Sequence, residues 1–174
     1  MIHRCGQIFF CVLFFFWVGI STATGQEQST ETGFVKLDSQ GQELSADAKQ
    51  WAMVRDKATG LIWEVKTTDG SIHDRDRTFG WEDAQEMFLA ELNAARFGGF
   101  SDWRLPTTDE LRSLRVKGAE PLINQEFFPN TVSTWYLSWR KCGSGEIFDE
   151  RVKFGKISNS KKDRRVRAVR SGQK

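Results

Sequence analysis

The side chains that could act as nucleophiles or as metal ligands are few. Beyond residue 25, His73 is the only histidine and Cys142 is the only cysteine. A Ser-His-Asp or Cys-His site would have to use His73, and no nucleophile motif lies near it. Zinc sites draw mainly on several histidine and cysteine ligands. The sequence therefore predicts no catalytic triad, no metal and no cofactor.

Acidic side chains are the remaining catalytic candidates. A glycosidase needs two carboxylates that face each other, and a sequence does not give their separation. An envelope glycan hydrolase of this kind therefore stays open as the alternative function, although no motif supports it. The acids of segment 73–76 could suggest calcium, but the glycine and terminal glutamate of a calcium loop are missing. We interpret this segment as a solvated charged loop in which Arg75 and Arg77 offset the acids.

The charge of the chain is unevenly spread. Residues 139–174 include 12 basic and 4 acidic side chains, a net charge of +8. Residues 26–138 include 12 basic and 19 acidic side chains, a net charge of −7. The basic end suits an acidic polysaccharide or another anionic cell-surface component, because arginine pairs well with sulfate, phosphate and carboxylate.

A strand at the basic end would place several cations together. If Val166 and Ala168 point into the core, Arg165 and Arg167 project from the opposite face. The alternative is that these cations are solvated and paired with acids of the first part of the domain. We predict that the binding site consists of Lys161, Lys162, Arg164, Arg165 and Arg167.

Cys142 lies in the glycine-rich segment 141–145, which is typical of a turn. An exposed thiol there could link two chains in an oxidising compartment. The alternative is a partly buried, inert cysteine, since cysteine is among the most often buried residues. A Cys142-linked dimer is therefore a prediction of the sequence.

The elements that would position these residues are short. Apolar residues at helical spacing predict a helix over 81–95, ended by Gly98 and Gly99. A second helix begins at Thr107, whose hydroxyl caps it while Glu110 reaches back. Between these helices, either a contact between Asp102 and Arg104 or backbone hydrogen bonds are expected to fix the loop. Strands are predicted at 34–37, 51–54, 61–63, 134–139, 151–154 and 166–170, with a turn at 56–60.

The N-terminal residues predict export. Arg4 is followed by an apolar run over 8–20 and then by small residues, which is typical of a signal peptide. The run is shorter than the roughly 20 residues of a membrane-spanning helix. We predict a signal peptide over 1–23, with cleavage after Ala23 or Gly25, a flexible lead-in over 24–33 and one domain over 34–172. The mature protein would be periplasmic, secreted or on the cell surface, without a membrane span.

Four segments in order carry a resemblance to a known family. They are 54–66 (VRDKATGLIWEVK), 97–107 (FGGFSDWRLPT), 127–131 (FFPNT) and 166–170 (VRAVR). The chain resembles the Lcl C-terminal domain family, which is named after the end domain of a collagen-like bacterial adhesin. The resemblance implies an α+β domain that is similar to the C-type-lectin-like fold, with short antiparallel strands and two helices.

The resemblance also bears on function. In the named adhesin, the family domain is associated with sulfated polysaccharide. Formylglycine-generating enzymes share the lectin-like fold, but their chemistry uses two cysteines, which Cys142 alone does not supply. We therefore expect a non-enzymatic binding module for acidic or sulfated glycans at the cell envelope. Nucleic acid is not an expected partner, because the protein is exported.

Overall fold

In the computed structural model, a tight turn between two apolar segments forms the centre of the fold. Strand β2 (Met53–Asp56) leads into this turn and β3 (Leu61–Glu64) leaves it, and the two strands pair antiparallel. Asp56 accepts hydrogen bonds from Ala58 N at 2.9 Å and from the Thr59 hydroxyl at 2.7 Å. The predicted turn at 56–60 is confirmed, whereas β2 begins two residues later than expected.

The structure describes residues 33–142, 145–153 and 164–172, with side chains for 33–139 and 164–172. All of these residues belong to one compact unit, Thr32–Lys174. The predicted signal peptide and nearly all of the predicted lead-in lie outside the described residues and stay predictions. No helix of the described part is long and apolar enough to cross a membrane.

The central sheet has four strands in the order β1-β2-β3-β7, with every neighbouring pair antiparallel. Its outer strands are β1 (Phe34–Leu37) and β7 (Val169–Ser171). All four residues of β3 are buried, because both faces of the sheet are covered. Ile62 belongs to the core under the long helical segment, while Trp63 belongs to the core on the other face. This alternation follows from the two-residue repeat of a strand.

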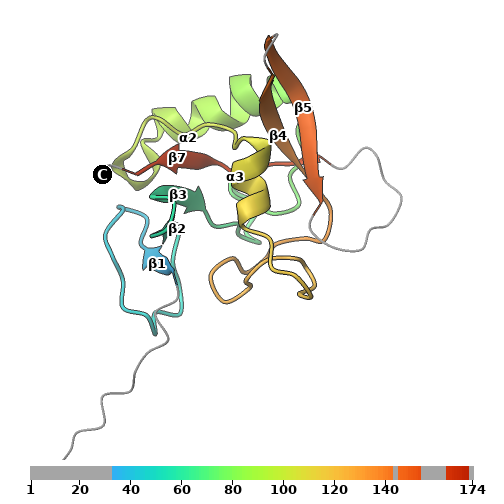
Figure 1. Cartoon of the computed structure of the whole chain (residues 1–174). Coiled ribbons are helices and arrows are strands. Elements are labelled where there is room, and N and C mark those ends of the chain that lie inside the picture. Colours follow the sequence, from blue (N-terminus) through green and yellow to red (C-terminus); the bar gives the residue numbers. More distant parts are fainter. Residues whose placement is uncertain (1–32, 143–144, 154–163, 173–174) are drawn as a thin grey trace, which may run out of the picture. The chain divides into compact units, whose positions relative to one another are not determined.

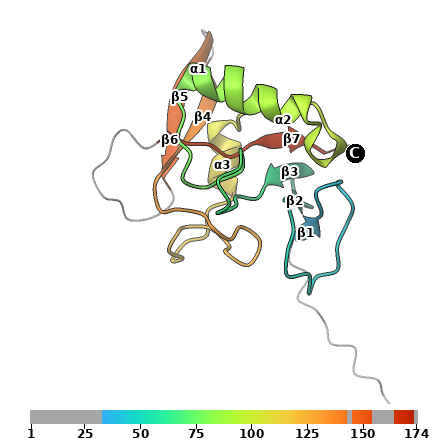
Figure 2. The same cartoon turned by 180° about the vertical axis from the view of Figure 1, so that it is seen from behind.

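The long helical segment covers one face of this sheet. It consists of α1 (Trp81–Asp83), the π-helix η1 (Ala84–Leu89) and α2 (Ala90–Ala94). It runs along β7 and β3 in Figures 1 and 2. The helix predicted over 81–95 is confirmed, although its π-helical middle was not foreseen.

This helical segment ends before the predicted glycines, because Arg96 takes the left-handed conformation with a φ of +50°. The chain turns through the short 3-10 helix η2 (Phe97–Gly99), where Gly98 has a φ of +67°. A Cβ atom on Gly98 would lie 2.5 Å from the Met53 side chain. Gly98 is therefore required by its backbone angle and by the lack of space.

The other face of the sheet is covered by α3 (Thr108–Ser113) and by the loop that follows it. The predicted capping box is confirmed. Glu110 N donates to the Thr107 hydroxyl at 3.2 Å, and Thr107 N donates to the Glu110 carboxylate at 2.8 Å. Leu111 and Leu114 are buried in this second core, as expected from their spacing.

A second sheet of three strands lies next to α3 and has the order β5-β4-β6. Strands β4 (Trp135–Cys142) and β5 (Gly145–Lys153) form a long antiparallel hairpin. The short β6 (Arg164–Arg165) pairs parallel with β4, and Figure 2 labels it next to the hairpin. The strands predicted at 134–139 and 151–154 are confirmed, but the hairpin is longer than expected.

The single strand predicted over 166–170 is wrong. The chain pairs with β4 through β6, and then with β3 of the other sheet through β7. It therefore crosses between the two sheets, and 166–168 is not a regular strand.

These elements confirm the α+β class. The similarity to the C-type-lectin-like fold is not confirmed by them and stays a prediction.

Candidate functional site

The predicted basic strip is only partly described, and its described members face inward. Lys161 and Lys162 lie outside the described residues. Arg164 and Arg165 form β6, and both are half-buried. Arg165 hydrogen bonds to the backbone oxygen of Arg75 and, at 3.1 Å, to the carboxylate of Asp76. Arg165 therefore joins β6 to a loop of the first half of the chain.

The prediction for Arg167 is wrong, because Arg167 does not project into solvent. Val166 and Ala168 are buried as expected, but Arg167 is also buried, with 1% of its surface exposed. Two-sided alternation fails here because 166–168 crosses between the sheets. All three side chains are consequently enclosed by the domain.

Several contacts within the protein hold the Arg167 guanidinium. It donates to the backbone oxygen of Glu64 at 2.6 Å and to the Thr131 hydroxyl at 2.8 Å. Its central carbon lies 5.2 Å from the centre of the Phe128 ring, within reach of a cation–π interaction. These contacts satisfy an arginine that would otherwise be costly to bury.

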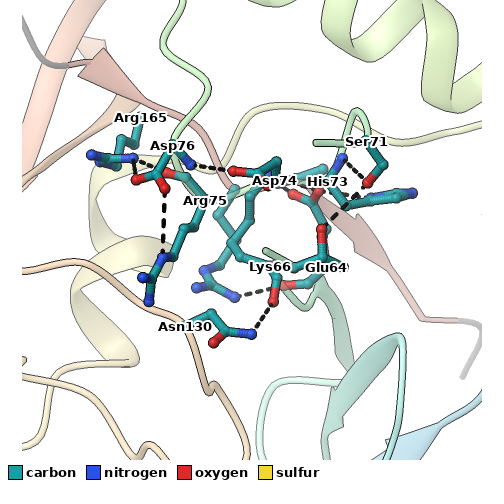
Figure 3. A network of polar contacts seen from close by, with 12 residues as sticks. Glu64, Lys66, Ser71, His73, Asp74, Arg75, Asp76, Asn130 and Arg165 are labelled. Atoms are coloured by element: carbon teal, nitrogen blue, oxygen red, sulfur yellow. Dashed lines mark hydrogen bonds and ion pairs between the residues drawn. The ribbon is translucent and has the colours of Figure 1, made fainter. Parts of the chain in front are cut away.

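Glu64 is the centre of the polar network in Figure 3. Its surface is 0% exposed, and that of Lys66 is 2% exposed. One carboxylate oxygen lies 2.9 Å from Lys66 Nζ and 2.9 Å from His73 Nδ1, and the other accepts from Ala168 N at 3.0 Å. An ionised carboxylate can only accept hydrogen bonds, so His73 Nδ1 carries the hydrogen.

Glu64 and Lys66 each influence the pKa of the other. Burial by itself would raise the pKa of Glu64, but the Lys66 ammonium and the hydrogen bond with His73 outweigh it and hold the pKa below its usual value. Burial lowers the pKa of Lys66, against the attraction of Glu64. Glu64 is thus ionised at neutral pH, and both of its oxygens accept hydrogen bonds from protein donors. A buried carboxylate with three donors is suited to structural cross-linking and poorly suited to proton transfer with a substrate.

The loop with His73 differs from the solvated charged loop that was predicted. Asp74 is buried and accepts from Gly70 N and Asp76 N, both at 2.7 Å. These backbone hydrogen bonds lower the pKa of Asp74. The Asp74 carboxylate therefore stabilises the conformation of the loop through backbone hydrogen bonds. The His73–Glu64 contact holds the loop against the sheet.

Of the two expected ways to fix this loop, the contact between Asp102 and Arg104 is not made, because each side chain pairs elsewhere. The alternative is confirmed, since backbone hydrogen bonds join Arg104 and Val169 at 2.9 and 3.0 Å. Both oxygens of Asp102 bind Arg170, at 2.7 and 3.2 Å. Arg104 binds both oxygens of Glu110, at 2.8 and 2.7 Å. The two ion pairs tie this segment to β7 and to the first turn of α3. Trp103 is buried in the core, as predicted.

The four segments quoted in the sequence analysis meet around these contacts. Segment 166–170 contacts the other three: the first and third through Arg167, and the second through Arg170. Asn130 of the third segment also donates to the backbone oxygen of Lys66 at 3.0 Å (Figure 3). The shared sequence pattern is therefore a set of structural cross-links.

Comparison with protein families agrees with this pattern. The model of the Lcl C-terminal domain matches residues 52–170, which is more than half of the chain. The chain belongs to the Lcl C-terminal domain family. No curated protein and no solved structure matches the chain.

The structure of this Lcl C-terminal domain bears on two other predicted features. Among the described residues, no group of three histidine, cysteine or acidic side chains could hold a metal ion. Cys142 is the last residue of β4 and pairs across the hairpin with Gly145. The side chain of Cys142 lies outside the described residues, so the Cys142-linked dimer stays a prediction.

The sequence reasoning missed the buried cluster of Glu64, Lys66 and Arg167. One signal could have revealed it. Glu64 and Lys66 follow Ile62 at two-residue spacing, so all three lie on the sheet face that the predicted helix must cover. Lys66 Nζ indeed lies 5.1 Å from the ring centre of Phe88 in that helical segment.

Proposed function

We propose that this protein is an exported, non-enzymatic binding module for acidic or sulfated glycans at the cell envelope. The single observation that carries this proposal is the uneven charge, with a net +8 over 139–174. Three of the 12 basic residues in this segment, Arg165, Arg167 and Arg170, are tied to described partners. The excess of basic over acidic residues in this segment is a composition that suits an anionic polymer.

The buried network supports a binding role over a catalytic one. Glu64, Lys66 and Arg167 have the side-chain types that catalytic sites use, but they are enclosed and bonded to one another or to the backbone. A catalytic group must reach its substrate directly or through one water molecule. These three side chains therefore fit the role of a scaffold that presents other surfaces.

The experiment is chromatography of the folded mature domain on heparin and on an uncharged polysaccharide matrix. We expect retention on heparin at low ionic strength, elution by salt, and no retention on the uncharged matrix, because salt screens exposed charges. Passage through heparin without retention contradicts the proposal. Release of reducing ends from a glycan by the same preparation would favour the hydrolase instead.

A charge variant locates the interaction. Lys161→Gln with Lys162→Gln should elute from heparin at lower salt than the wild type. The control is Lys49→Gln with Lys57→Gln, which removes two exposed cations elsewhere. Arg165 and Arg167 are left unchanged, because their contacts hold the fold.

A further inference from the structure

A basic hollow lies at the end of α3, and none of its lining residues belongs to the network or to the predicted strip. Its volume is about 270 Å³. No acidic side chain lines the hollow as the structure describes it. The lining residues are Arg112, Arg115, Val116, Lys117, Gly118 and Leu122.

The hollow is built on a rigid frame. Leu114 and Ile123, which flank it in the sequence, are buried in the second core. Arg115 and Ile123 pair as an antiparallel bridge, and Val116 N donates to Leu122 O at 3.1 Å. Between these contacts the chain reverses at Gly118, which has a φ of +86°. Arg115 and Lys117 are thus carried by a loop that is closed at its base, whereas Arg112 lies on α3.

The charges of the hollow are not balanced by its own lining. Arg112, Arg115 and Lys117 are all exposed. Arg112 has an acidic neighbour, Asp109, at 3.5 Å, but that carboxylate is almost fully exposed on α3. Like charges three residues apart destabilise a helix end slightly. An anion bound between these cations would remove that repulsion.

The chemistry of the lining suggests what kind of anion would fit. An arginine fork can donate two hydrogen bonds to one sulfate or phosphate, and lysine adds a point charge. Val116, which is 42% exposed, and Leu122 offer apolar contact beside the cations. The volume lies just below the roughly 300–1,000 Å³ of typical ligand pockets. One substituted sugar therefore fits better than a longer oligosaccharide.

We infer that this hollow binds a sulfate or phosphate ester group carried on a single sugar unit. Arg115 and Lys117 would hold the ester oxygens, with Arg112 at the edge, while Val116 and Leu122 contact the sugar ring. The inference deepens the proposed function, on which it rests for the glycan nature of the ligand.

The test is an NMR titration of the folded mature domain with three matched sugars. They are N-acetylglucosamine 6-sulfate, N-acetylglucosamine 6-phosphate and unsubstituted N-acetylglucosamine. We expect at least one of the two esters to shift the amide signals of 112–118 and 122, and the unsubstituted sugar to leave them in place. The stronger ester identifies the source of the oxyanion. Absence of shifts in this segment with both esters, or equal binding of the neutral sugar, overturns the inference.

Variants make the test specific. Arg115→Gln with Lys117→Gln should weaken binding of the ester by at least about tenfold, because charge-assisted hydrogen bonds are lost. Lys49→Gln with Lys57→Gln should change it less than about twofold, since additional distant charges are screened. Wild-type affinity in the first pair, with an unchanged unfolding midpoint, overturns the inference.

The two proposals can fail separately. Retention on heparin without shifts in the hollow leaves the proposed function standing and removes this site. Ester binding in the hollow without retention on heparin supports this site and removes the proposed polysaccharide partner.

Discussion

The cluster around Glu64 and the hollow after α3 use the same kinds of charged side chain in opposite ways. In the cluster, Glu64, Lys66 and Arg167 are enclosed, and each has partners within the protein. In the hollow, Arg115 and Lys117 are exposed and no acid shares the lining. A buried charge must be paired within the protein, whereas an exposed charge is solvated by water and can bind a ligand. Burial therefore separates charges that hold the fold from charges that are available for binding.

The largest expected effect comes from breaking the cluster. Glu64→Gln keeps the shape of the side chain but leaves Lys66 buried without its counter-ion, which should lower the free energy of unfolding by about 3–5 kcal/mol. The control is Glu126→Gln at an exposed position, expected to change it by no more than about 0.5 kcal/mol. Urea denaturation measures both. Equal midpoints for the two variants would show that the cluster is not needed for stability.

Acidification should remove the stability that the ionised Glu64 carboxylate contributes. The folded pKa of Glu64 lies below its ordinary value of 4.5. Its ionised form therefore stabilises the fold fully above about pH 4.5, and this contribution is lost as pH falls through the folded pKa. The gap between wild type and Glu64→Gln should narrow from pH 7 to pH 3. A gap that stays constant over this range would contradict an ionised Glu64 in the folded protein.

A smaller effect on stability is expected from a change in the cap of α3, the helix that leads into the hollow. Thr107→Ala removes the hydroxyl that caps α3, which should cost about 1 kcal/mol. Thr107→Ser keeps a capping hydroxyl and should cost less. Thermal unfolding compares the two variants. If alanine and serine behave alike, α3 is held by its buried leucines and by Arg104–Glu110 without help from the cap.

The smallest effect on stability is expected in the hollow itself. Arg115→Gln with Lys117→Gln removes exposed charges, so the free energy of unfolding should change by less than about 0.5 kcal/mol. The same variant should lose the ester binding proposed above. A large loss of stability, measured by urea denaturation, would show that these cations stabilise the fold, as the charges of the cluster do.

Local interactions were predictable from the sequence because their partners are near in the chain. The turn at Asp56, the helix over 81–95 and the capping box of Thr107 and Glu110 all depend on residues within a few positions. The family resemblance was confirmed for the same reason, because its segments are themselves continuous stretches.

Long-range partners were decided by the tertiary structure. One of the two expectations for Asp102 was a contact with Arg104, two residues away, but Asp102 binds Arg170, which is 68 residues away. Arg167 was expected in solvent, but it lies between the two sheets and donates to the Glu64 backbone, 103 residues away. Alternation along a strand predicts two faces, yet it cannot indicate that the chain leaves one sheet for another.

The sequence by itself thus determined the α+β class, the family, most local elements and the excess of cations near the C-terminus. Only the tertiary structure decided which of these cations are used internally and that a separate basic hollow exists. The physical reason is that the role of a charged side chain depends on how deeply it is buried and on which opposite charge lies nearest to it. Both depend on segments that meet only after folding, as Glu64, Thr131 and Arg167 do here.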